Sequence, residues 1–103
     1  MRPVTPAAEL AVVVLSHGND DTILAAVDSV LAQDEPVELV VSHSGPGRVQ
    51  DLLPGVRVVA SSQRRLPGAA RNAGVAATSA PFVAFLSGDA RARPGWVSGR
   101  LAR

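Results

Sequence analysis

The chain has 103 residues and a formal net charge of +1, which limits it to one domain and gives no electrostatic argument for binding nucleic acid. Hydrophobic residues make up 47% but include only two Phe and one Trp, so we expect a core of aliphatic side chains. The absence of Cys excludes disulfides and thiolate metal sites, and no apolar stretch approaches the about 20 residues that cross a bilayer.

The N-terminal segment lacks the pattern of a folded element. Residues 1–8 contain two prolines and no hydrophobic periodicity, and predict a flexible leader before one domain at 9–103. A charged region followed by an apolar one is missing, so the segment is not a secretion signal. The composition, rich in Ala, Val, Gly, Pro and Arg, suggests a bacterial source. We therefore expect a cytoplasmic protein, either soluble or peripheral to the inner membrane.

Strands and helices alternate along the first part of the chain. The continuous apolar run at 10–15 (LAVVVL) predicts a strand buried on both faces. Apolar positions at helical spacing predict a helix over 22–33, which ends before Pro36. A second short strand is predicted at 37–41 (VELVV).

The alternation continues to the end of the sequence. The predicted elements are a loop at 42–47, a short helix at 48–53, a strand at 56–60, a polar loop at 61–66, a helix over 68–78 that Pro67 opens, a strand at 82–86 and a helical stretch after Pro94. This order predicts an α/β fold with a mostly parallel sheet of about four strands and helical crossovers, truncated after the fourth strand. Ligands bind such sheets at the carboxyl ends of the strands, so the loops at 16–20, 42–47, 61–67 and 87–93 form the candidate site.

Common motifs are missing from these loops. Neither GxGxxG nor GxxxxGK[ST] follows the first strand, and no GxSxG nucleophile elbow is present, which disfavours a dinucleotide fold of the usual kind, a P-loop and a serine hydrolase. His17 and His43 follow neighbouring strands and could form a two-histidine metal site. Because no carboxylate directly neighbours either one in the sequence, we interpret both as loop residues or ligand-packing groups.

Charged residues in the last two loops allow two interpretations each. Arg64, Arg65 and Arg71 flank a predicted helix start, where backbone N–H groups and guanidinium groups bind phosphate, but the alternative is that they are solvated surface charges, as most Arg are. Asp89 follows the fourth strand in the sequence Ser-Gly-Asp. One carboxylate is enough for a divalent cation that is bound to a diphosphate, and Ser-Gly-Asp is also ordinary turn chemistry.

Four segments together resemble a known family. They are LAVVVLSHGNDDTILAAVDSVLAQ, VELVV, LPGAARNAGVAAT and PFVAFLSGDARARPGW, which follow one another at the spacing found in the nucleotide-binding half of family 2 glycosyltransferases. The resemblance covers about residues 9–100. It implies a Rossmann-like GT-A fold and a nucleotide-diphosphate-sugar donor, which the family usually binds with Mg²⁺ or Mn²⁺.

The resemblance also implies which residues contact the nucleoside. The first loop of the family runs along the nucleobase and ribose, which places Ser16, His17 and Asn19 there. His17 stands where the family has an aromatic residue that can stack. The second loop of the family usually carries an acid that holds the base or ribose, and here Ser42 occupies this region.

The remaining family positions concern the diphosphate and the metal. Arg71 and Asn72 match the family's A-R-N sequence, which lies beside the donor diphosphate and sugar. The family's D-x-D metal motif corresponds to 87–89, where Ser87 replaces the first acid, and the resemblance implies that Asp89 is the metal ligand. No residue is assigned as the catalytic base.

These assignments lead to two hypotheses about function. The first is a glycosyltransferase that transfers a sugar from a nucleotide-diphosphate-sugar to an unknown acceptor in a cell-envelope polysaccharide, a lipid or another glycan. The alternative is a truncated or degenerate non-catalytic relative, which binds a nucleotide or a partner subunit without transfer. A sheet that ends after the fourth strand also leaves an uncovered edge, through which we expect self-association.

Overall fold

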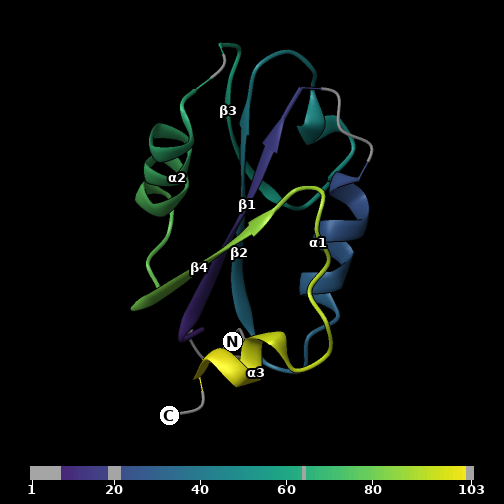
Figure 1. The fold of residues 1–103 in the computed structure, drawn as a ribbon, viewed down its shortest axis with the longest axis vertical. Helices are drawn as coiled ribbons and strands as arrows, with labels where there is room; N and C mark the ends of the chain where they lie inside the picture. The colour runs from purple at the N-terminus through teal and green to yellow at the C-terminus, as the bar shows by residue number, and fades with distance from the viewer. Residues whose placement is uncertain (1–7, 19–21, 64, 102–103) are drawn as a thin grey trace, which may run out of the picture.

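A computed structural model describes residues 8–18, 22–63 and 65–101 (Figure 1). The elements are β1 (Leu10–His17), α1 (Ile23–Leu31), β2 (Val37–Ser44), the short 3₁₀ helix η1 (Val49–Asp51), β3 (Arg57–Ser61), α2 (Pro67–Ala76), β4 (Phe82–Ser87) and α3 (Trp96–Leu101). Residues 1–7 of the predicted leader lie outside the described residues. Within the described helices, none is long and apolar enough to span a membrane.

The four strands form one parallel sheet in the order β3-β2-β1-β4. β1 lies in the middle because its apolar run is buried on both faces, and its residues from Leu10 to Val14 are at most 3% exposed. This arrangement confirms the predicted α/β fold with helical crossovers between parallel strands. β3 and β4 are the edge strands of the described sheet, and self-association through an edge stays a prediction.

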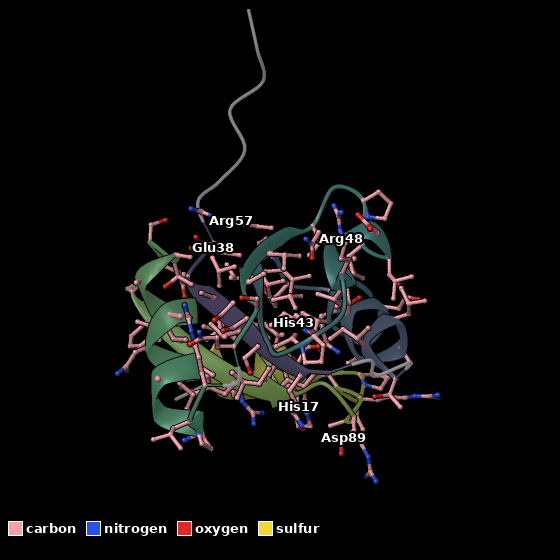
Figure 2. All side chains as sticks on the ribbon, turned by 90° about the horizontal axis from the view of Figure 1, so that it is seen from above. His17, Glu38, His43, Arg48, Arg57 and Asp89 are labelled. Atoms are coloured by element: carbon pink, nitrogen blue, oxygen red, sulfur yellow. The ribbon has the colours of Figure 1, made fainter. Side chains whose placement is uncertain are left out.

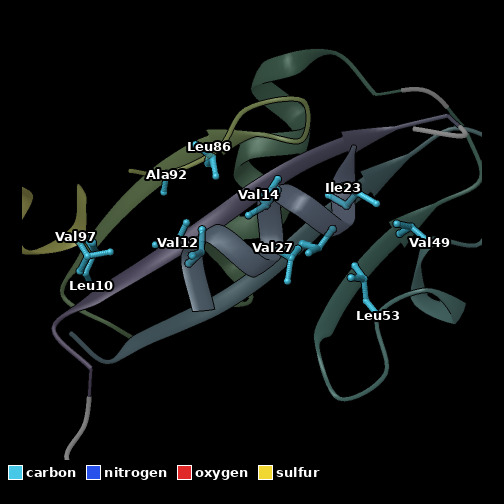
Figure 3. Packing of buried hydrophobic residues seen from close by; sticks show 13 residues of the cluster. Leu10, Val12, Val14, Ile23, Val27, Val49, Leu53, Leu86, Ala92 and Val97 are labelled. Atoms are coloured by element: carbon cyan, nitrogen blue, oxygen red, sulfur yellow. The ribbon is translucent and has the colours of Figure 1, made fainter. Parts of the chain in front are cut away.

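One face of the sheet is covered by α1 and by the segment that leads to α3. The buried residues of α1 are Ile23, Ala26, Val27 and Val30. They pack against Val12 and Val14 of β1, and Val97 of α3 joins the same cluster (Figure 3). After β4 the chain runs back beside α1 and reaches α3 at the amino-terminal end of the strands (Figure 1).

The opposite face is covered by α2, which carries small residues (Figure 1). Only Ala70 and Gly74 of this helix are buried. A Cβ atom at Gly74 would overlap a methyl carbon of Val13 in β1. The helix can therefore lie this close to the sheet only because a glycine faces Val13.

The strands β1 and β2 both continue past the ends that the sequence pattern predicts, at 15 and 41, so residues 16–17 belong to β1 rather than to a loop. Polar residues led us to predict that the second strand ends at 41 and that a loop begins at 42, but β2 continues to Ser44. The loop assignment for 42–44 was therefore wrong. In the parallel register Leu15–His17 pair with 42–44 of β2, so backbone hydrogen bonds continue the ladder where the side chains are polar.

Candidate functional site

A cleft of about 460 Å³ lies at the carboxyl ends of the strands, on the α2 side of the sheet. Its strand-end wall consists of Leu15, Ser16 and His17 of β1, Ser44 of β2 and Ser87 of β4. The opposite wall is formed by the start of α2 and the two residues before it, namely Arg65, Leu66, Pro67 and Ala70. The cleft thus combines an apolar wall, several hydroxyl groups, an imidazole and a guanidinium group.

Glycines join the loops that carry the strand-end wall. In each of three loops a glycine donates its backbone N–H to a residue near the end of the neighbouring strand. The pairs are Gly18 to Ser44 at 3.1 Å, Gly45 to Ser61 at 2.9 Å and Gly88 to Leu15 at 2.7 Å. These bonds extend the parallel ladder past the strand ends, so the rim of the cleft is held by backbone contacts across all four strands.

The Ser87-Gly88-Asp89 turn borders this cleft. A Cβ atom at Gly88 would lie 2.6 Å from the carbonyl oxygen of Leu15, so only glycine fits at this close approach. The Ser87 hydroxyl donates to Oδ1 of Asp89 at 2.5 Å. The Thr22 hydroxyl donates to the Gly88 carbonyl at 2.7 Å, which attaches the turn to the start of α1. The Asp89 carboxylate is therefore exposed but anchored through both of its neighbours.

His17 and His43 do not form a common site. His43 is 1% exposed, and its ring bonds to two internal partners. The Pro46 carbonyl can only accept, so Nε2 of His43 donates to it at 3.1 Å. In the neutral ring, Nδ1 then accepts from the Ser16 hydroxyl at 3.0 Å. Because strand side chains alternate between the faces, His17 points to the other side, away from this pair.

His17 is exposed and belongs to the rim of the cleft. It also contributes to a smaller hollow of about 200 Å³, whose other walls are Gly18, Ser44, Gly45 and Pro46. Figure 2 looks onto this end of the molecule and shows His17 and Asp89 toward the same side, with His43 further inside. An imidazole between two adjoining hollows can pack against a flat ring.

Some of the residues predicted to contact the nucleoside line the cleft, and others lie in the interior. Ser16 and Ser42 are buried, and the Ser42 hydroxyl donates to the Ala70 carbonyl of α2 at 2.8 Å. That bond holds α2 on the sheet. Asn19 lies outside the described residues. A nucleotide-binding role for these three residues stays a prediction.

The arginines near α2 differ in their position relative to the cleft. Arg71 and Asn72 are exposed on α2 and are not among the residues that line the cleft. The Arg71 guanidinium lies 5.8 Å from the centre of the Phe85 ring on β4. Arg65 does line the cleft, whereas Arg64 is outside the described residues. The sequence pattern marked the helix start but did not select Arg65 over Arg71.

The side chains present fit a cation that takes most of its ligands from a diphosphate. Within 8–18, 22–63 and 65–101, no group of three or more His, Asp or Glu side chains is close enough together to hold a metal ion alone. The Asp89 carboxylate and the Ser87 hydroxyl place two kinds of oxygen atom side by side next to the cleft. Mg²⁺ in particular is commonly bound through one or two carboxylates plus phosphate oxygens and water.

Fold and site together define a class of protein. A parallel α/β sheet with its cleft at the strand ends, a helix start with an arginine on one wall and an acid turn at the rim is suited to a phosphorylated ligand. Residues 11–103 match the family described as "Glycosyl transferase family 2", and the chain belongs to this family. The matched part corresponds to the N-terminal half of such a transferase, as the sequence resemblance predicted.

A curated relative shows the same similarity. The chain is 37% identical over 93 residues to "Succinoglycan biosynthesis protein ExoO" of Rhizobium meliloti (strain 1021). The matching region covers 84% of this chain and 27% of that protein. The chain therefore spans about a quarter of the length of this relative.

Proposed function

We propose that the cleft binds the nucleoside diphosphate part of an activated sugar, and that the chain is the donor-binding part of a glycosyltransferase. The observation that carries this proposal is the position of the cleft, which in this member of the family lies at the strand ends between Arg65 and Ser87. The similarity to a succinoglycan biosynthesis protein supports a glycan as the product.

Each wall has a distinct task in this proposal. Arg65 and the N–H groups at the start of α2 bind the diphosphate oxygens, since a guanidinium group and a helix N-terminus both favour an anion. His17 packs against the nucleobase or ribose from the opposite rim. Ser16, Asn19 and Ser42 shape the nucleoside side of the site, and Arg71 and Asn72 lie toward the sugar.

Asp89, with Ser87 beside it, is the proposed ligand of Mg²⁺ or Mn²⁺. A divalent cation held there supplies positive charge to the diphosphate that leaves during transfer. The chain's own contribution is to hold the carboxylate at the rim through Gly88 and to direct the Ser87 hydroxyl at it. Ser87 offers a neutral oxygen where a second carboxylate would bind more strongly, so we expect a weak cation site.

A binding experiment tests this proposal. In calorimetry, the affinity of the 103-residue chain for a nucleoside diphosphate should rise about tenfold when Mn²⁺ is added, because Asp89 would hold a cation that adds positive charge beside the phosphates. Asp89→Ala should abolish the increase and leave the affinity without metal unchanged. Arg65→Ala should weaken binding by about tenfold with and without metal, since one charge-assisted contact is lost.

The matched control is Asp34→Ala, which removes an exposed carboxylate just after α1 and should leave all these affinities unchanged. Absence of binding for uridine, guanosine, cytidine and thymidine diphosphates, with and without Mn²⁺, would refute the proposal. The exposed Asp89 with a single hydroxyl partner also favours a second candidate, a relative that binds nucleotide without transfer. Metal-linked binding with no release of nucleoside diphosphate from nucleotide-sugars and glycan acceptors would identify that function.

A further inference from the structure

A polar stripe on α1 contacts the chain segment that follows Asp89. The stripe consists of Thr22 just before α1, Ser29 within the helix and Gln33 two residues after its end. The buried residues of α1 face the apolar core, and the hydroxyl and amide groups beside them bond to polar partners. Their partners are backbone groups of residues 88–97.

Gln33 uses both ends of its side-chain amide on this segment. Nε2 donates to the Arg93 carbonyl at 2.9 Å, and Oε1 accepts from the Val97 N–H at 3.1 Å. Nε2 also donates to the Ser29 carbonyl at 3.1 Å. A carbonyl only accepts and a backbone N–H only donates, so these partners fix the orientation of the amide and no acid could replace it.

Ser29 and Thr22 act on the part of the segment nearer the cleft. The Ser29 hydroxyl accepts from the Ala92 N–H at 2.8 Å while donating to the Ala26 carbonyl at 2.7 Å. The Thr22 hydroxyl donates to the Gly88 carbonyl. Asp89 therefore lies in a short span whose two ends, Gly88 and Ala92, are both bonded to α1.

The same segment is anchored by two apolar side chains. Ala92 is 8% exposed and Val97 is fully buried in the core cluster. Their backbone N–H groups would be without partners inside the protein if Ser29 and Gln33 lost their polar atoms, and an unsatisfied buried N–H is costly. Burial and hydrogen bonding thus fix the segment at the same two residues.

We propose that Ser29 and Gln33 are positioning residues that hold the Asp89 carboxylate at the rim of the cleft. They contact neither cleft nor ligand, and they act through the backbone of 92–97. The inference rests on the proposed role of Asp89 in metal-linked nucleotide binding. It explains why a serine and a glutamine, rather than apolar residues, lie beside the aliphatic core at positions 29 and 33.

The sharpest variant is Gln33→Glu, which keeps the size of the side chain and the acceptor for Val97. It replaces the donor to Arg93 with an oxygen that repels the carbonyl, so the segment should move away from α1. The matched control is Gln50→Glu, the same change at an exposed glutamine of η1. Ser29→Ala removes the acceptor for Ala92, and Ser29→Thr restores a hydroxyl.

Two affinities are measured for each variant, that for nucleoside diphosphate alone and that with Mn²⁺. Gln33→Glu and Ser29→Ala should lower the Mn²⁺-dependent gain in affinity by on the order of fivefold to tenfold, because the carboxylate is displaced. The affinity without metal should stay within about twofold of the original protein. Ser29→Thr and Gln50→Glu should keep the full gain.

Amide signals in NMR give a second, ligand-free measurement. Hydrogen exchange at Ala92 and Val97 should accelerate, and the signals of Asp89 and Ala90 should shift, in Gln33→Glu but not in Gln50→Glu. A full Mn²⁺-dependent gain in Gln33→Glu and Ser29→Ala, with only a lower melting temperature, would overturn the inference while leaving the proposed function intact. If the original protein binds no nucleotide, unchanged Asp89 signals in Gln33→Glu would overturn it separately.

Discussion

The two faces of the sheet hold their helices by different means. On the α1 face, four buried side chains of the helix join a continuous aliphatic cluster with β1, β2, β4 and α3. On the α2 face, only Ala70 and Gly74 of the helix are buried, and hydrogen bonds add to the attachment. The Ser42 hydroxyl donates to α2, and the Glu38 carboxylate accepts from the residues just after it.

Because of this difference, one face of the sheet contributes most to stability and the other carries the candidate site. A wide aliphatic interface releases much apolar surface from water and dominates the free energy of folding. The small side chains of α2 bury less apolar surface. The start of α2 forms one wall of the cleft, and the strand ends form the other. The candidate site therefore lies on the face where packing is lighter, and the other face stabilises the sheet that presents it.

The largest expected effect is on the α1 face. Ile23→Ala should lower the free energy of unfolding by about 2–5 kcal/mol, because Ile23 is fully buried beneath the Gly88 turn and truncation leaves a cavity. Urea denaturation measures the change. The control is Leu24→Ala, where the side chain is 42% exposed and a loss below about 1 kcal/mol is expected. Equal losses for both variants would contradict the view that this face carries the stability.

A smaller effect with an unusual sign is expected on the α2 face. Gly74→Ala should destabilise by about 1–3 kcal/mol, because the added methyl group overlaps Val13 and forces α2 away from the sheet. Alanine normally stabilises a helix interior relative to glycine by about 1 kcal/mol. Gly68→Ala in the same helix meets no atom within 4 Å and should be neutral or stabilising. A stabilising Gly74→Ala would show that α2 does not need its close approach.

Much of the fold could be predicted because its signals are local. The apolar run of β1 and the helical spacing in α1 each lie within a few residues of sequence, and the alternation of elements implies parallel strands. The end of β2 could not be predicted in this way. Ser42 and Ser44 are of a residue type that is common in loops, and only their pairing with β1 makes them strand residues.

The candidate site was predictable in position but not in detail. The strand-end rule located the cleft, which Ser87 lines two residues before Asp89, and the role of Asp89 as a metal ligand stays a prediction. Whether Arg65 or Arg71 faces the cleft depends on where α2 begins and how it is rotated on the sheet, which only tertiary contacts set. The polar stripe on α1 was hidden for a similar reason, since Gln33 and Val97 are 64 residues apart in sequence.

The smallest of the three effects concerns the polar attachment after α2. The Ser79 N–H donates to the Glu38 carboxylate, and so does the Ala80 N–H, each at 2.9 Å. The Ser79 N–H first of all, and more weakly the nearby Arg57 guanidinium, hold the pKa of Glu38 below its ordinary value. Figure 2 shows Arg57 beside Glu38.

The sign of the pH dependence follows from this direction. A carboxyl group with a lowered pKa in the folded protein stabilises it above its unfolded pKa of about 4.3, and the contribution is lost as the pH falls through the folded pKa. Glu38→Gln should therefore lower stability at pH 7 by less than about 1 kcal/mol, because the group is partly solvated. The deficit should shrink as the pH falls from about 5 toward 3.

Glu35→Gln, at an exposed carboxylate after α1, should not reproduce this pattern in urea denaturation across the same range. A Glu38→Gln deficit that stays constant with pH would mean that the charge of Glu38 does not contribute to holding the end of α2 against β2.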